Sequence, residues 1–122
     1  MGWNAVFYEN LSGRKPVQRF LLELEARPRA KCLKYIKMLE DNGFSLPFNY
    51  LEKVRGDLWA LRPEFAGNEY RIIFFFDDKS GTFVLVHAIL KNTKRLEAND
   101  ITTADNRKDE WIARSARKKE KS

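Results

Sequence analysis

The chain contains one cysteine and one histidine in 122 residues. The single cysteine, Cys32, excludes an internal disulfide and is typical of a protein from a reducing compartment. One cysteine and one histidine are too few for a zinc site of the usual kind, in which four ligands surround the metal. We therefore predict a protein without a disulfide, a bound metal or another cofactor.

Long hydrophobic runs and nucleotide-binding motifs are also missing. No apolar run reaches the roughly 20 residues that span a membrane, and the first residues lack the basic-then-apolar order of a signal peptide. The sequence has no GxxxxGK[ST] or GxGxxG loop, no HExxH and no CxxC. These absences favour a cytoplasmic protein that has no membrane partner and no small-molecule cofactor.

Charge is unevenly distributed along the chain. The formal net charge is +6, and residues 107–122 contribute +4 of it, from seven Lys or Arg and three Asp or Glu. The hydrophobic content of 43% is that of a folded protein, and the length suits one domain. Because no apolar anchor follows Ala113, we predict one folded domain over residues 1–113 and a basic, flexible tail over residues 114–122. The positive surplus suits a nucleic-acid partner.

Two apolar stripes at helical spacing predict a helical hairpin in the first half of the chain. The first helix starts at Pro16, a residue favoured at the first helical position, and ends at Arg27, because the residue before a proline leaves helical geometry. The second opens at Pro28 and stops at Asn42-Gly43. The two stripes are Val17, Phe20, Leu21 and Leu24, then Cys32, Leu33, Ile36 and Leu39.

Four strands and a last helix complete the predicted fold. Trp3–Tyr8 is the first strand, and three more follow over Asp57–Arg62, Tyr70–Phe76 and Thr82–Leu90. The third of the four is aromatic or β-branched almost throughout and should lie at the centre of the sheet. The last helix begins at Asn99 or at the aspartate after it, either of which can cap it. The order β-α-α-β-β-β-α predicts a single α+β domain, with an antiparallel-dominated sheet packed against the helical hairpin and the C-terminal helix.

Each of the last three strands has a cation at one end. Arg62 closes the first, Arg71 opens the second and Lys91 closes the third. Because antiparallel neighbours put the end of one strand beside the start of the next, all three should lie at one end of the sheet, with Lys94 and Arg95 just beyond. Such a cluster makes a positive site of the size of a phosphate group. The alternative is that each strand simply ends in a solvated charge.

A site made of arginine and lysine can bind a phosphodiester and stabilise the charge of a pentacovalent transition state without a metal. The nucleophile must then come from the substrate, and RNA carries one in its 2′-hydroxyl. We expect Arg71, on a rigid central strand, to contact the phosphate, and its replacement by alanine to leave the protein folded. The alternative is that Arg71 only pairs with an acidic neighbour, Glu64 or Glu69.

The single histidine, His87, lies inside an apolar strand. The period of two predicts that Phe83, Leu85 and Ile89 share its face of the sheet. A histidine in such surroundings is either a core or edge residue or a contributor to the cation site.

A series of short motifs extends over the second half of the chain. Its residues, in order, are Leu58-Trp59, Leu61-Arg62-Pro63, Tyr70-Arg71-Ile72, His87, Lys91, Thr93, Ile101 and Ala104. In these residues the chain resembles the RelE/HigB superfamily of bacterial and phage toxins, and most closely its phage-derived HigB-like branch. The resemblance extends over about residues 6–112 and implies a RelE-like fold, which agrees with the predicted order of helices and strands.

The resemblance implies a toxin that cuts mRNA on the ribosome without a metal. Cleavage by attack of the 2′-hydroxyl would leave a 2′,3′-cyclic phosphate, and Arg62, Arg71 and Lys91 would be the catalytic residues. It also implies neutralisation by a cognate antitoxin, in this branch usually a helix-turn-helix protein.

The best-studied RelE-like enzymes carry lysines along the strand that ends at Leu-Arg, where this chain has the apolar or small residues Leu58 and Ala60. We therefore assign RNA binding to the nearest cations upstream, Lys53 and Arg55, together with His87, Lys94 and Arg95. Some relatives inhibit DNA gyrase instead of cutting RNA. The alternative function is thus a non-enzymatic protein of this fold, either a gyrase-binding toxin or a cleavage-dead binder of its antitoxin.

Overall fold

The computed structural model describes residues 2–91 and 96–121, with the backbone alone for residues 119–121. In it, three α-helices pack on one mixed sheet of six strands, which confirms the α+β fold class predicted from the sequence. The elements are β1 (Asn4–Phe7), α1 (Pro16–Glu23), α2 (Ala26–Asn42), a 3-10 turn (Gly43–Ser45), β2 (Leu51–Arg55), β3 (Leu58–Leu61), β4 (Glu64–Phe65), β5 (Asn68–Asp77), β6 (Thr82–Lys91) and α3 (Ala98–Lys121). Within the described residues, none of the helices has both the length and the apolar character needed to cross a lipid bilayer.

The sheet is built around β5. Its strands lie in the order β1-β6-β5-β3-β2, and the two-residue strand β4 pairs with β5 beside this path. The pair β1 and β6 is parallel, and the other pairs are antiparallel. The residues Ile72–Phe75 of β5 are all buried. The prediction of a central strand covered on both faces is therefore confirmed.

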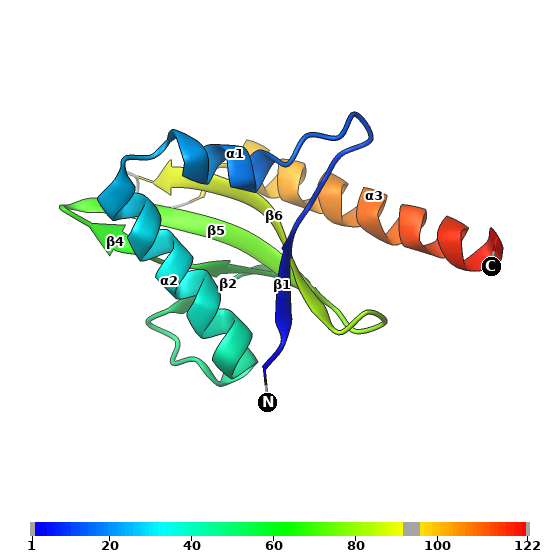
Figure 1. Ribbon diagram of the computed structural model, residues 1–122, viewed down its shortest axis with the longest axis horizontal. Coiled ribbons are helices and arrows are strands. Elements are labelled where there is room, and N and C mark those ends of the chain that lie inside the picture. The colour runs from blue at the N-terminus through cyan, green and yellow to red at the C-terminus, as the bar shows by residue number, and fades with distance from the viewer. Residues whose placement is uncertain (1, 92–95, 122) are drawn as a thin grey trace.

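Helices cover both faces of the sheet (Figure 1). On the face covered by α1 and α2, which we call the α1/α2 face, Leu21 and Leu39 share a core with Phe74. On the opposite face, which we call the α3 face, Ala104 shares a second core with Phe75. Successive residues of β5 thus alternate between two cores, as the pleat of a strand requires.

Two strands, β2 and β4, were not predicted, so the observed order is β-α-α-β-β-β-β-β-α. In β2, the register against β3 shifts between Lys53 and Arg55. Two consecutive residues, Val54 and Arg55, consequently lie on the α3 face, where Val54 packs into the core and Arg55 pairs with Asp105. Leu51, in contrast, packs into the core of the α1/α2 face. The shift breaks the period of two that marks a strand in a sequence, and β4 is too short to show any period.

The ends of the helices agree with the sequence at two of the predicted places, whereas α1 ends at Glu23 and not at Arg27. α1 begins at Pro16 and α2 ends at Asn42, followed by Gly43 with a positive φ of 57°. α3 begins at Ala98, one residue ahead of the predicted cap. The start of α2 differs, because the helix opens at Ala26 and takes Pro28 into its first turn, where a missing N–H costs nothing.

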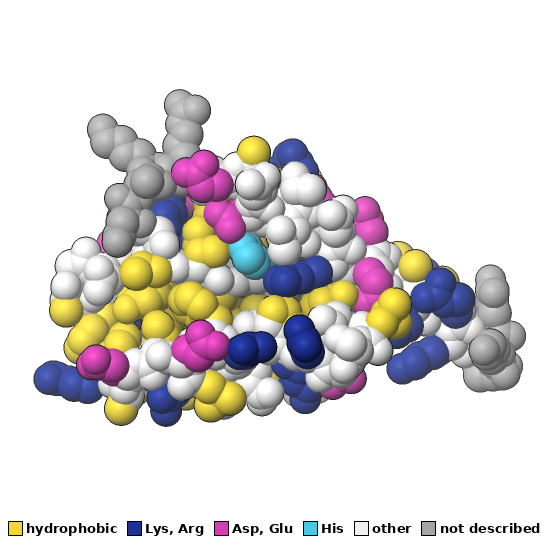
Figure 2. Space-filling view, turned by 90° about the horizontal axis from the view of Figure 1, so that it is seen from above, with side chains coloured by type: hydrophobic (Ala, Val, Ile, Leu, Met, Phe, Trp, Pro, Cys, Tyr) yellow, Lys and Arg dark blue, Asp and Glu magenta, His cyan; other side chains and the backbone are white. Residues whose placement is uncertain are grey.

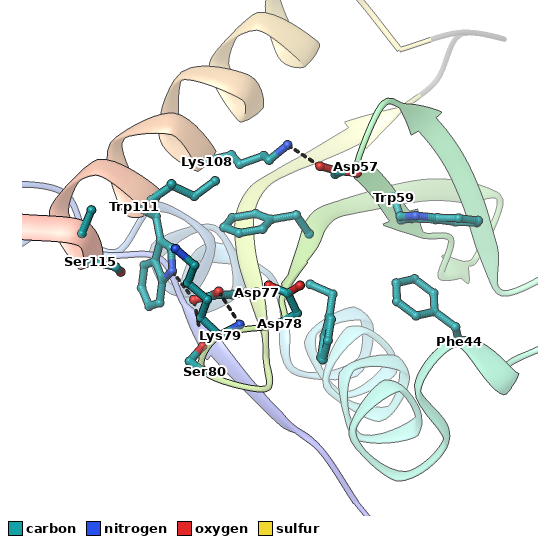
Figure 3. A pocket seen from close by; sticks show the side chains of 14 residues that line it. Phe44, Asp57, Trp59, Asp77, Asp78, Lys79, Ser80, Lys108, Trp111 and Ser115 are labelled. Atoms are coloured by element: carbon teal, nitrogen blue, oxygen red, sulfur yellow. Dashed lines mark hydrogen bonds and ion pairs between the residues drawn. The ribbon is translucent and has the colours of Figure 1, made fainter. Parts of the chain in front are cut away.

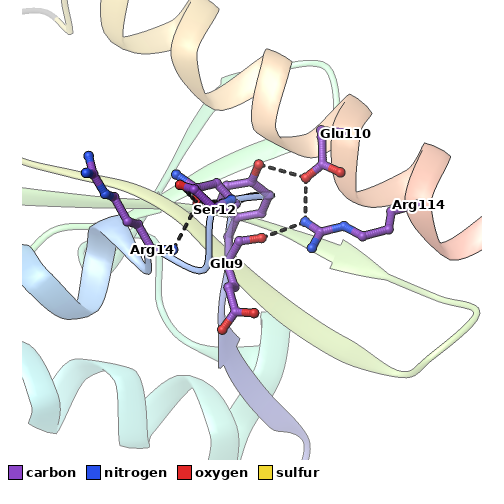
Figure 4. A network of polar contacts seen from close by, with 7 residues as sticks. Glu9, Ser12, Arg14, Glu110 and Arg114 are labelled. Atoms are coloured by element: carbon purple, nitrogen blue, oxygen red, sulfur yellow. Dashed lines mark hydrogen bonds and ion pairs between the residues drawn. The ribbon is translucent and has the colours of Figure 1, made fainter.

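α3 continues to Lys121, so the basic segment after Ala113 is helical where the sequence predicts no regular structure. Figure 4 shows what holds this part of the helix. The hydroxyl of Tyr8 donates a 2.8 Å hydrogen bond to Oε1 of Glu110, and Arg114 donates to the same carboxylate and, at 2.6 Å, to the carbonyl oxygen of Glu9. Burial, and then the hydrogen bond to Glu110, raises the pKa of Tyr8 to about 12.

Two truncations should separate the anchored part of α3 from the rest. Removing residues 117–122 should leave the thermal midpoint unchanged, because Arg117 and Lys118 are exposed and have no partner in the described part of the chain. Removing residues 114–122 should lower the free energy of unfolding by about 1 kcal/mol, the usual worth of a hydrogen-bonded group such as Arg114. Thermal and urea unfolding followed by circular dichroism measure both. Equal midpoints for the two truncations would show that Arg114 does not anchor the helix.

Candidate functional site

The three cations predicted at the strand ends do lie at the same end of the sheet. β3 pairs with β5 through Leu61 and Ile72, which puts Arg62 beside Arg71. β6 pairs with β5 through Glu69 and Lys91, so that Lys91 returns to the same end. We call Arg62, Arg71 and Lys91 the strand-end cluster.

Arg71 is held by carboxylates inside the protein. Its side chain is only 3% exposed, and its Nε donates a 3.2 Å hydrogen bond to Oε1 of Glu52 on β2. Its Nη1 donates to the carbonyl oxygen of Tyr70 at 2.9 Å, and its Nη2 lies 3.6 Å from Oε1 of Glu69. Ala60 of β3, opposite Glu52, carries only a methyl group, which leaves room for the side chains of β2 and β5 to meet above it. Arg71 therefore ties β2 to β5 and has little surface to offer a ligand.

Arg62, unlike Arg71, is not paired with a carboxylate in the described part of the chain. Its Nε is buried and has no hydrogen-bond partner among the described residues. A buried donor without a partner carries a free-energy cost, and the rest of this partly exposed side chain keeps its charge for an incoming anion. Arg62 is thus the arginine of the strand-end cluster that is not committed to a carboxylate. Lys91 is buried, with 5% of its surface exposed.

A β-bulge changes the face on which His87 lies. The register of β5 against β6 shifts between Ile73, which pairs with His87, and Phe74, which pairs with Leu85. Phe83 and Leu85 accordingly belong to the core of the α1/α2 face, whereas His87 contacts α3 on the other side. The prediction that His87 shares their face is wrong, because one extra residue in the strand reverses the alternation that follows it.

Both ring nitrogens of His87 are hydrogen bonded to α3. Nε2 lies 2.8 Å from Oδ1 of Asp100, and Nδ1 lies 3.2 Å from Nη1 of Arg107, which also donates to the carbonyl oxygen of Val86 at 2.7 Å. Because a guanidinium only donates, Nδ1 accepts and Nε2 carries the proton that goes to Asp100. Burial lowers the pKa of Arg107. Figure 2 shows the histidine between acidic and basic side chains, beside a hydrophobic surface. This arrangement makes His87 an anchor for α3.

Replacing His87 with alanine should therefore lower stability before it affects any contact with RNA. The loss leaves the hydrogen-bonding groups of Asp100 and Arg107 without their partner, which costs about 1–3 kcal/mol. Urea denaturation measures the cost, with Asp41→Ala on the exposed surface of α2 as the control. A variant of native stability with weaker RNA binding would contradict the anchoring role and support the role assigned from the sequence.

The remaining cations predicted to bind RNA lie apart from the strand-end cluster or outside the described residues. Lys53 extends over the ring of Trp59, with its Nζ 4.6 Å from the ring centre, on the α1/α2 face. Arg55 pairs with Asp105 of α3. Lys94 and Arg95 fall outside the described residues. For these four residues, contact with RNA remains a prediction.

Three residues of this region were missed by sequence reasoning. Asp100 and Arg107 lie with Ala104 and Trp111 on one face of α3, at intervals of four, three and four residues. Two charged residues in an otherwise apolar stripe indicate polar partners on the sheet, and this signal could have been used to find the contacts of His87. Glu52 gave no such signal, because the strand that carries it was not predicted. Its side chain is 29% exposed, which leaves the carboxylate accessible beside Arg71.

Comparison with known protein families gives a match, which covers the part of the chain that carries the candidate site. The family described as "Phage derived protein Gp49-like (DUF891)" matches residues 19–109, which include the whole strand-end cluster and His87. A search of curated proteins gave no match. The matched family is a toxin-like family of phage-derived proteins. Since the match covers most of the chain, the protein belongs to the Gp49-like family of phage-derived proteins.

Proposed function

We propose that this protein is the toxin of a toxin–antitoxin pair and that it cuts mRNA on the ribosome. The observation that carries the proposal is Arg62, a partly buried arginine with an unsatisfied Nε at the strand-end cluster, in a chain of a toxin-like family. A guanidinium that no carboxylate neutralises is suited to bind a phosphodiester and to stabilise the negative charge that develops on it. We also propose that the protein is a member of the HigB-like branch, which its motifs resemble, and that it acts in the cytoplasm.

Glu52 supplies a second chemical group for this reaction. Attack of the 2′-oxygen on phosphorus requires that the 2′-hydroxyl lose its proton, and an accessible carboxylate can accept it. Arg71 fixes Glu52 from the buried side through the 3.2 Å hydrogen bond. In this scheme Arg62 contacts the phosphate, Glu52 accepts the proton, and Arg71 positions Glu52. As the new bond to phosphorus forms, the bond to the 5′-oxygen breaks and that oxygen takes a proton from solvent, so the products are a 2′,3′-cyclic phosphate and a 5′-hydroxyl end.

A non-enzymatic function is favoured by a different observation. Two members of the strand-end cluster, Arg71 and Lys91, are buried, and Arg71 is paired with two carboxylates. A protein that only binds DNA gyrase, or only its antitoxin, has no need of exposed cations at this place. Under this alternative, the cluster stabilises the sheet and performs no chemistry.

The deciding experiment measures cell growth and maps the 5′ ends of mRNA in the same cells. The protein is induced in cells with and without the neighbouring reading frame, and the 5′ ends of mRNA are mapped after induction. We expect growth arrest that the neighbouring protein relieves, and new 5′-hydroxyl ends within translated regions. The same cleavage should persist with purified ribosomes in the presence of a metal chelator. Growth arrest with unaltered mRNA and inhibited DNA supercoiling would refute the nuclease and support the gyrase-binding alternative.

A further inference from the structure

A pocket of about 620 Å³ lies at the opposite end of β5 from the strand-end cluster. Figure 3 shows its two sides, with Trp111 and Lys108 of α3 on one side and Phe44 and Trp59 on the other. The β5–β6 turn, with Asp78 among its residues, closes it below. Nothing in the proposed cleavage of RNA uses this pocket.

One wall of the pocket is an open strand edge. β3 pairs with β5 only as far as Phe74, opposite Trp59. β5 continues to Asp77, and in the described part of the chain its last three residues, Phe75–Asp77, pair with β6 alone. These residues line the pocket. A sheet edge of this kind offers backbone groups to an extended peptide that lies alongside it.

The charge of the pocket opposes that of the whole protein. Its lining contains three carboxylates, Asp57, Asp77 and Asp78, and two amines, Lys79 and Lys108, which gives a net charge of −1 in a chain of +6. Asp57 is occupied by Lys108 at 3.0 Å, and this hydrogen bond and charge lower its pKa. Asp78 is exposed at the mouth of the pocket, and among the described residues it has neither a hydrogen-bond nor an ion-pair partner. Nucleic acid is disfavoured here, since carboxylates repel phosphates.

Two aromatic side chains of the pocket, Trp111 and Trp59, contact polar or charged groups. The indole Nε1 of Trp111 donates a 2.9 Å hydrogen bond to Asp77, which also accepts from the hydroxyl of Ser80 at 2.9 Å. Burial acts to raise the pKa of Asp77, but these hydrogen bonds and those from the turn outweigh it and leave the pKa lowered. The indole of Trp59 already has the ammonium group of Lys53 over its ring. Aromatic faces beside a carboxylate form the usual surroundings of a bound guanidinium.

We propose that this pocket binds an arginine side chain on an extended segment of a partner protein, and that the segment adds as a short strand beside Phe75–Asp77. The guanidinium stacks on the aromatic walls and pairs with Asp78, while the backbone of the segment bonds to the edge of β5. Because the pocket and the strand-end cluster lie at opposite ends of β5, the partner can be bound while Arg62 stays open to RNA. The proposal therefore goes beyond the proposed cleavage and does not depend on it.

The test is a titration of the full-length, ¹⁵N-labelled protein with the acetylated and amidated pentapeptide Thr-Val-Arg-Val-Thr, followed by nuclear magnetic resonance. We expect shifts of the indole signals of Trp59 and Trp111 and of the amides of residues 75–78. The third tryptophan, Trp3, does not line the pocket and serves as the internal control. Shifts at the strand-end cluster in place of the pocket, or no shifts at saturating peptide, would overturn the proposal.

Three altered ligands and two protein variants test which groups of the peptide and of the pocket are in contact. A peptide with neutral citrulline in place of arginine should bind about tenfold more weakly, and Asp78→Asn should weaken the arginine peptide about as much. Asp41→Asn, on exposed α2, is the matched control and should change nothing. N-methylation of the peptide backbone should also weaken binding, and free agmatine should bind less tightly than the peptide. Equal binding of the citrulline peptide, or agmatine as tight as the peptide, would refute the docked arginine segment.

Discussion

Replacing Arg62 with alanine is expected to lower the rate of mRNA cleavage by about 10²–10³-fold, the usual cost of losing one donor to the charge of the transition state. The expectation depends on the state of its guanidinium, which in the described structure is not paired with a carboxylate. The same feature predicts that the variant stays folded, because its removal leaves no acidic partner behind. Single-turnover cleavage on translating ribosomes, beside urea denaturation, measures both quantities.

The control for Arg62 is another arginine removed from the surface. Arg19 of α1 forms an exposed ion pair with Glu23, so Arg19→Ala lowers the net charge equally but should change stability by no more than about 1 kcal/mol. Its cleavage rate should equal that of the parent protein. If Arg62→Ala cleaves RNA as fast as Arg19→Ala does, Arg62 is not at the site of reaction, and the non-enzymatic alternative gains support.

Replacing Arg71 with alanine is expected to destabilise the protein by about 3 kcal/mol. Removing one member of a buried ion pair leaves the other charge without its partner, and such losses usually lie between about 3 and 5 kcal/mol. We expect the lower figure, because Glu52 and Glu69 are partly exposed and water can solvate them. The sequence alone predicts that this variant stays fully folded. Because the structure shows Arg71 buried and paired, we expect a loss of stability instead. Urea denaturation gives the value directly.

A double-mutant cycle tests whether the pair with Glu52 causes this loss. Arg71→Ala, Glu52→Gln and the double variant are compared, and the two single costs should sum to more than the double cost by about 1 kcal/mol or more. Additive costs would show that Arg71 stabilises the sheet by packing alone. The cleavage rates of the folded fractions separate the role of Arg71 in stability from its role in positioning Glu52. If Arg71 positions Glu52 for proton transfer, Glu52→Gln should also cleave RNA slowly.

Most of the fold could be predicted because its signals are local. Pro16 and Gly43 mark the ends of the helical hairpin through backbone geometry that few other residues share. The long strands β5 and β6 were found because runs of aromatic and β-branched residues are rare outside strands. The missed strand β2 has charged residues on both faces and an irregular register, so neither composition nor period reveals it.

The candidate site was predictable in its position and not in its contacts. Strand order alone brings Arg62, Arg71 and Lys91 to one end of the sheet. Which of them is buried depends on Glu52, whose strand had not been predicted, and on the small size of Ala60 across from it. The face of His87 depends on a bulge that leaves no mark in the amino-acid sequence. Both failures concern how one strand pairs with another, which residue-by-residue patterns do not contain.

The parallel pair β1 and β6 has a consequence for the order in which the protein forms during synthesis. Asn4 lies opposite Thr82, and Phe7 lies opposite Leu85, so the first strand waits for a partner that is made 78 residues later. Contacts so far apart in sequence close slowly, because the intervening chain must first be ordered. α3, which covers the second face of the sheet, follows β6 and is made after it. A nascent chain is therefore without its complete sheet until β6 has been made, and so the strand-end cluster is assembled only after Lys91 at the end of that strand.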